Sequence, residues 1–164
     1  MPDTPVELDS LRRRLLVAGC SRWVLAPLLS SVGLVPRRVL AADASRLAFQ
    51  ATSLADALQV AGASAAADSP LIVIKAVDIS ENGAQVPIEV VSNIPDSQQM
   101  LIFVDKNPLP LAAKLIFANG TVPRARLQLK MAETSRIRVV IRAANGKTYH
   151  ASREVKVTIG GCGT

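Results

Sequence analysis

Short runs in which polar and apolar side chains alternate constrain the fold of this chain more than any other feature. A period of two places successive side chains on opposite faces of a β-strand, so one face is buried and the other is solvated. After residue 70 the sequence contains seven such β-rich runs, of four to seven residues each. They cover residues 71–74, 86–91, 100–104, 114–118, 124–130, 136–142 and 153–159.

Three Asn-Gly pairs lie between these runs: Asn82-Gly83, Asn119-Gly120 and Asn145-Gly146. This dipeptide readily takes the positive φ angles that tight hairpin turns require, so we expect antiparallel pairing. Seven strands without alternating helices predict an all-β fold, an immunoglobulin-like antiparallel β-sandwich of two sheets. A small barrel is the alternative.

Residues 45–69 predict a short N-terminal helix and a connection, ahead of a sandwich domain at 70–159. Ser53 is followed three residues later by Asp56, a spacing that can cap a helix. We expect Gly62 to end this helix. Its apolar side would consist of Leu54, Ala57, Leu58 and Ala61.

Residues 1–44 predict a removed export signal rather than part of the fold. Arginines at 12–14 precede an apolar stretch at 23–36 and small residues at 41–44. The Arg12-Arg13-Arg14-Leu15-Leu16 run resembles a twin-arginine signal, which indicates export by that route.

Two alternatives exist for this leader. A retained membrane anchor needs roughly 18 apolar residues, and the stretch at 23–36 is shorter, so we expect no stable membrane insertion. The Val17-Ala18-Gly19-Cys20 sequence resembles a lipoprotein cleavage box. Only five residues separate Cys20 from the arginines, which is short for an apolar region.

The net charge of +6 does not indicate a nucleic-acid partner. Six of the 19 basic residues lie in the first 38 positions, and the remaining chain has 13 Lys and Arg against 10 Asp and Glu. There is no dense basic patch, and the few aromatic residues form no stacking signature.

The mature chain offers little for catalysis. His150 is its one histidine, which excludes a His-rich metal site, and beside Tyr149 it is most simply a surface or edge residue. No Gly-rich phosphate loop opens a helix. We therefore expect no metal, no cofactor and no enzymatic activity.

Cys162 is the one thiol left after removal of the leader, so it has no internal disulfide partner. Gly160, Gly161 and Gly163 surround it near the terminus, which predicts a flexible arm at 160–164. Five extended residues reach at most about 17 Å. A tethered thiol of this kind suits a carrier that lowers a bound group into the cleft of another protein.

Other roles for Cys162 are an intermolecular disulfide in an exported structural module, an accidental thiol, or an enzyme nucleophile. The last needs a base held about 3 Å from the sulfur, which a mobile arm does not provide. Lys156 is six residues away, and the carboxylate of Thr164 opposes ionisation, so the free thiol is expected to be unactivated.

Three separated motifs resemble the sulfur-oxidation carrier family SoxY. They are Glu81-Asn82-Gly83-Ala84-Gln85-Val86-Pro87, Asn107-Pro108-Leu109-Pro110 and the ending Val155-Lys156-Val157-Thr158-Ile159-Gly160-Gly161-Cys162-Gly163. Together with the leader, the resemblance spans nearly the whole chain. The family typically ends Gly-Gly-Cys-Gly-Gly, whereas this chain closes with Thr164.

The resemblance implies a periplasmic carrier in thiosulfate oxidation, with Cys162 as the covalent attachment site and Gly160, Gly161 and Gly163 as hinges. It implies a heterodimer with a SoxZ-like β-sandwich subunit. It also implies three partner enzymes: a cytochrome c enzyme that joins sulfur to the cysteine, a sulfate-releasing hydrolase and a sulfane dehydrogenase.

Overall fold

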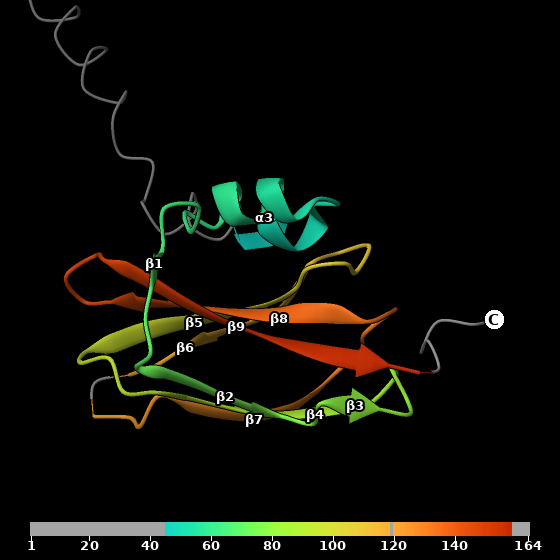
Figure 1. The fold of residues 1–164 in the computed structure, drawn as a ribbon. Helices are drawn as coiled ribbons and strands as arrows, with labels where there is room; N and C mark the ends of the chain where they lie inside the picture. Colours follow the sequence, from blue (N-terminus) through green and yellow to red (C-terminus); the bar gives the residue numbers. More distant parts are fainter. Residues whose placement is uncertain (1–44, 119, 159–164) are drawn as a thin grey trace, which may run out of the picture. The chain divides into compact units, whose positions relative to one another are not determined.

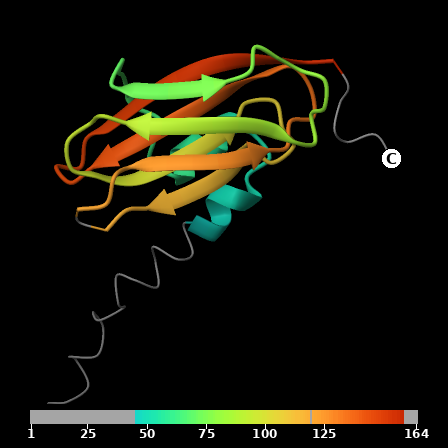
Figure 2. The same ribbon diagram turned by 90° about the horizontal axis from the view of Figure 1, so that it is seen from below.

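Two β-sheets packed face to face form the folded part of the chain (Figure 1). The computed structural model describes residues 45–118 and 120–158. The first sheet has the strand order β1-β9-β8-β5-β6, with β3 also paired to β9. The second sheet has the order β2-β4-β7, and Figure 2 shows β4 between its two neighbours. The predicted all-β sandwich is confirmed.

Every one of the seven predicted runs lies on a strand, and two further strands are present in the described residues. The strands are β1 (Ala67–Asp68), β2 (Ile72–Ala76), β3 (Ile79–Ser80), β4 (Val86–Ser92), β5 (Ser97–Val104), β6 (Leu111–Ile116), β7 (Arg124–Leu129), β8 (Ser135–Ala143) and β9 (Thr148–Val157). The two that the sequence did not predict, β1 and β3, have two residues each, too few to show an alternation. Both pair with β9 in parallel, so the first sheet is not wholly antiparallel.

The predicted helix is α3 (Leu54–Val60), and its cap is as expected. The backbone N–H of Asp56 donates to the Ser53 hydroxyl at 3.1 Å, and Gly62 follows with a φ of 64°. Residues 45–50 form an additional helix that the sequence pattern did not predict. Both helices lie over the outer face of the first sheet (Figure 1).

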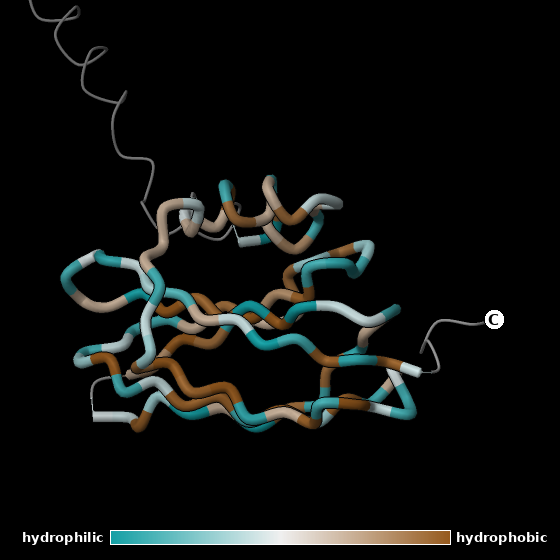
Figure 3. The backbone as a smooth tube through the Cα atoms, in the orientation of Figure 1, coloured by the Kyte–Doolittle hydropathy of each residue, from teal (hydrophilic) through white to brown (hydrophobic). Residues whose placement is uncertain are grey.

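The strand β5, which lies between β8 and β6, is apolar on both faces because both faces are covered. Met100, Ile102 and Val104 join the core between the two sheets. The alternate residues Leu101 and Phe103 pack under the helices in a second cluster. That cluster also contains Ala48, Ala57, Ala63, Leu111 and Val140. Figure 3 shows apolar segments both between the sheets and beneath the helical layer.

One of the three Asn-Gly pairs forms a hairpin as predicted. Gly146 connects β8 to β9 with a φ of 79°, and its N–H donates to the Ala143 carbonyl at 3.0 Å. The hairpin prediction is wrong for the other two pairs. The 119–120 pair connects β6 to β7 in different sheets, and the 82–83 pair connects β3 to β4, which do not pair. A turn dipeptide specifies local backbone geometry, not which strands pair.

An acidic side chain on the second sheet is held by two arginines of the neighbouring strand. Glu89 on β4 is paired with Arg126 on β7 in register, and its carboxylate lies 3.2 Å from Arg126 Nε. Arg124 forms a second ion pair with the same carboxylate. Burial alone would raise the pKa of Glu89, but hydrogen bonding and charge attraction from Arg124, Arg126 and Lys75 outweigh it and lower the pKa.

Glu89→Gln should remove a pH-dependent part of the stability. Because the folded-state pKa is lowered, the carboxylate stabilises the fold above its unfolded pKa, about 4.3, and this stabilisation is lost as the pH falls through the folded value. Urea midpoints should therefore differ between wild type and variant near neutral pH and converge in acid. A constant difference across this range would contradict the assignment. High salt should shrink the difference, since both arginines are substantially exposed.

Ile102→Ala should lower the free energy of unfolding by about 2–5 kcal/mol, because it opens a cavity between the sheets. Ile102 is fully buried, at 0% exposure. Val73→Ala on β2 is the control, since this side chain is 37% exposed and has less packing to lose. Urea unfolding measures both. Equal losses of unfolding free energy in the two variants would contradict the placement of Ile102 in the core between the sheets.

Candidate functional site

The residues predicted to carry substrate, Cys162 and its glycine neighbours Gly160, Gly161 and Gly163, lie outside the described residues. The structure describes the chain to Thr158, four residues before Cys162. It therefore shows how the root of the predicted carrier arm is built, and the site is described from that root.

The end of β9 is paired on both sides. Val155 is in register with Ser135 of β8, and Lys156 is in register with Ile79 of the short strand β3. The Lys156 N–H donates to the Asp78 carbonyl at 2.9 Å, and the Thr158 N–H donates to the Ser80 carbonyl at 3.1 Å. Backbone hydrogen bonds thus hold the chain in place as far as Thr158.

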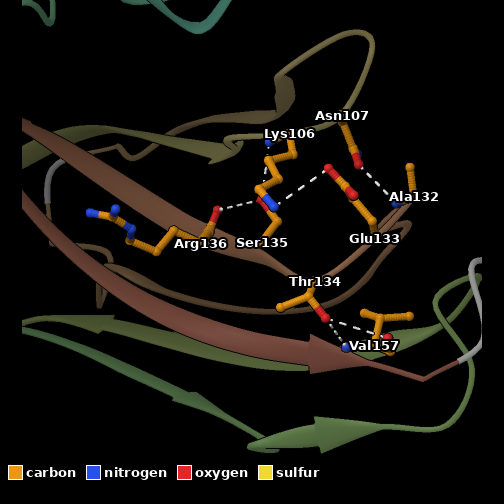
Figure 4. Close-up of polar contacts among 8 residues, drawn as sticks. All are labelled: Lys106, Asn107, Ala132, Glu133, Thr134, Ser135, Arg136 and Val157. Carbon is orange, nitrogen blue, oxygen red and sulfur yellow. Dashed lines mark hydrogen bonds and ion pairs between the residues drawn. The ribbon is translucent and has the colours of Figure 1, made fainter.

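The hydroxyl of Thr134, the residue before β8, also binds the backbone of β9. The Val157 N–H donates to Thr134 Oγ1 at 2.9 Å, and the same hydroxyl donates to the Val157 carbonyl at 3.4 Å. Figure 4 shows both contacts. Thr134 thus pairs with the backbone of β9 as a strand residue would. Nothing in the sequence identified this residue, because its partner lies 23 positions away.

Two further loops are tied to this root (Figure 4). The Lys106 N–H donates to the Ser135 hydroxyl at 3.0 Å. The Asn107 side chain donates to the Lys130 carbonyl at 2.7 Å and accepts from the Ala132 N–H at 3.0 Å. The β5–β6 loop is therefore linked to the β7–β8 loop, and that loop to β9. Asn107 is the first residue of the sequence motif at 107–110, and its side chain forms this link between the two loops.

Arg153 connects β9 to the second sheet. Its guanidinium donates to the Asp78 carboxylate at 2.7 Å and to the Ile74 carbonyl of β2 at 3.4 Å. The Asp78 carbonyl also accepts a hydrogen bond from the Lys156 N–H. Residues of β9 therefore hold the short segment before β3 through both the side chain and the backbone of Asp78. The arm root is consequently tied to both layers of the sandwich.

Within residues 45–118 and 120–158 no group of three potential ligand side chains could hold a metal ion. His150 is partly buried, and its Nδ1 lies 3.1 Å from the Ala66 carbonyl oxygen. Across the same ranges, no helix has the length and apolar character needed to span a membrane.

Comparison with solved structures gives a match at substantial sequence identity. The structure of the sulfur carrier protein SoxY from Chlorobium limicola f thiosulfatophilum matches with a TM-score of 0.59 and 40% identity. The match covers 65% of this chain and 97% of that one. No curated protein matches the sequence closely enough to count as a relative.

Superoxide reductases give weaker structural matches. The enzyme from Ignicoccus hospitalis has a TM-score of 0.46 and 12% identity, over 52% of this chain and 79% of that one. A variant from Archaeoglobus fulgidus has a TM-score of 0.42 and 12% identity, over 52% and 87%. At this level of likeness nothing about activity follows.

The family model for the sulfur oxidation protein SoxY matches residues 57–162, which include the strands, the arm root and Cys162. A protein that carries sulfur is not itself the catalyst, so the prediction of a carrier rather than an enzyme is confirmed. The chain belongs to the SoxY family of sulfur oxidation carrier proteins.

Proposed function

We propose that this protein carries sulfur intermediates as covalent adducts of Cys162 in the periplasm, after export by the twin-arginine route. The observation that carries the proposal is the fixed root at Thr158, from which a segment with a single thiol emerges. Four residues of chain limit the distance from Thr158 to Cys162 to about 14 Å. The thiol is thereby restricted to a small volume at one end of the sandwich.

Loading is an oxidation of two sulfur atoms. The Cys162 thiol loses its proton, its sulfur bonds to the outer sulfur of thiosulfate, and the two electrons released pass to a haem cytochrome. Water then attacks the sulfonate sulfur of the adduct and breaks its bond to the sulfane sulfur, whereas the bond between the sulfane sulfur and Cys162 stays. Sulfate and two protons leave, and a persulfide anion remains on Cys162.

The proposed partners are those that the family resemblance implies. A cytochrome c enzyme loads the thiol, a hydrolase releases sulfate and a sulfane dehydrogenase oxidises the remaining sulfur, with a SoxZ-like β-sandwich subunit completing the carrier.

Intact mass spectrometry of protein isolated from thiosulfate-grown cells tests the covalent role. We expect reductant-labile additions that correspond to sulfane sulfur or thiosulfate, and we expect Cys162→Ser to lack them. Free thiol alone, or a reductant-sensitive dimer without added sulfur, would reject the carrier role. The dimer would instead indicate an exported structural module linked through Cys162.

Thr134→Val should weaken the arm root, because valine has the shape of threonine but leaves the Val157 N–H without its 2.9 Å partner. The loss of this hydrogen bond should cost about 1–3 kcal/mol. Hydrogen exchange should accelerate at Val157, and the extent of Cys162 loading should fall. Thr134→Ser retains the hydroxyl and is the control. Unchanged exchange at Val157 in the valine variant would show that Thr134 does not hold the root.

A further inference from the structure

The two most exposed of the large apolar side chains at the end of the sandwich where β9 finishes belong to the β5–β6 loop and to β3. Leu109 in the β5–β6 loop is 50% exposed, and Ile79 on β3 is 59% exposed. Isolated exposed apolar residues are common on proteins, so exposure alone decides nothing. Their positions relative to Thr158 and the way that they are held are informative.

Ile79 lies directly beside the arm root. It is in register with Lys156, and the carbonyl of its neighbour Ser80 accepts the hydrogen bond from Thr158. The residue after it is buried, whereas Ile79 faces solvent. A partner protein that contacts Thr158 from the solvent side of the sheet would therefore also contact the Ile79 side chain.

Leu109 reaches the same end of the molecule through the linked loops. It is two residues from Asn107, whose amide binds the backbone at Lys130 and Ala132. Two residues further along, Thr134 binds Val157. Figure 4 shows the contacts of Asn107 with Ala132 and of Thr134 with Val157, and in Figure 1 the β5–β6 loop and the end of β9 lie at the same end of the sandwich.

The loop holds Leu109 in a defined place. Pro108 and Pro110 flank it and restrict the backbone on both sides. The Val104 N–H donates to the Pro110 carbonyl at 2.8 Å, which closes the loop across its base. An apolar group that is already ordered loses little conformational entropy when a partner covers it. Such an ordered apolar side chain is suited to anchoring a partner.

The length of the arm determines what must cover this surface. Cys162 lies within about 14 Å of Thr158 along the chain, so a protein that takes the thiol into a pocket has to stand over the end of β9. Even a small transient interface, roughly 500 Å² on each partner, is about 25 Å across. A footprint of that width, centred on the end of β9, would include Ile79 and extend toward the loops that Thr134 and Asn107 link to this strand.

Charges at this end are mixed rather than of one sign. Lys106 pairs with Glu133 at 3.6 Å, and the exposed Asp78 pairs with Arg153 at 2.7 Å. Lys156 is exposed beside Ile79. Charges of both signs provide no surface of a single sign that a strongly charged partner could complement. The affinity should therefore depend on burial of apolar side chains and change little with salt concentration.

Resting on the proposed function, we propose that Leu109 and Ile79 are the docking anchors for the enzyme that joins sulfur to Cys162. That enzyme would present an apolar rim around the pocket that receives the thiol. The two side chains would raise the affinity of the encounter, whereas the arm alone would enter the pocket.

Loading kinetics test this assignment. Full-length carrier is incubated with thiosulfate and a periplasmic extract of thiosulfate-grown cells, and intact mass follows the reductant-labile addition to Cys162. At low carrier concentration Leu109→Ser and Ile79→Ser should each slow loading about tenfold, as expected for the loss of an interface anchor. At saturating carrier the rates should converge with the wild-type rate, because the anchors act on binding and not on chemistry.

Val122→Ser is the matched control, since Val122 is 69% exposed in the β6–β7 loop, at the opposite end of the strands. Its loading rate should equal that of the wild type. Alkylation of Cys162 by iodoacetamide should be equal in all four proteins, which excludes an effect on the thiol itself. Wild-type loading at every concentration in both anchor variants would overturn the docking assignment and leave the carrier function standing. Absence of loading in the wild type would remove both.

Discussion

The fixed pairing of β9 is the constraint on which the rest of this molecule depends. β9 forms hydrogen bonds with β8 along its length and with the two short strands β1 and β3 on its other side. Arg153 adds a link to the second sheet. Because the chain continues from β9 to the single predicted carrier thiol, every contact that holds this strand also limits where that thiol can go.

A fixed root and a short arm together keep the local concentration of the Cys162 thiol high near the end of β9. The entropy of closing a chain onto a target rises slowly with its length, but a frayed β9 would lengthen the free segment and spread the thiol over a larger volume. The Val157 N–H donates to Thr134 and the Thr158 N–H donates to the Ser80 carbonyl, and these hydrogen bonds prevent fraying at the last two described residues of the chain. β3 has two residues, yet this end of β9 would have an open edge without it.

The sequence predicted the features that depend on local pattern. Alternation identified the seven longer strands, and the spacing of Ser53 and Asp56 identified α3 with its cap. Features that depend on distant partners were missed or wrong. The helix at residues 45–50 has no strong apolar period, and it is stabilised by burial of Ala48 in the cluster that contains Leu101 and Phe103. The role of Thr134 arises because the fold brings it to Val157, and the pairing of strands around two Asn-Gly turns was wrong for the same reason.

A carrier has to leave each partner as readily as it arrives, and this requirement limits how large its docking surface can be. An extensive apolar patch would bury enough area to make release slow, since most differences in affinity between related complexes lie in the dissociation rate. Two separate anchors, set among charges of both signs, bury a small area and leave the rest of the contact solvated. The order built into the β5–β6 loop offsets this small area, because a pre-formed loop spends little binding energy on its own ordering. Rigid loops around a fixed root are therefore compatible with short-lived contacts. A large flexible surface would spend binding energy on its own ordering and, once bound, would release the partner slowly.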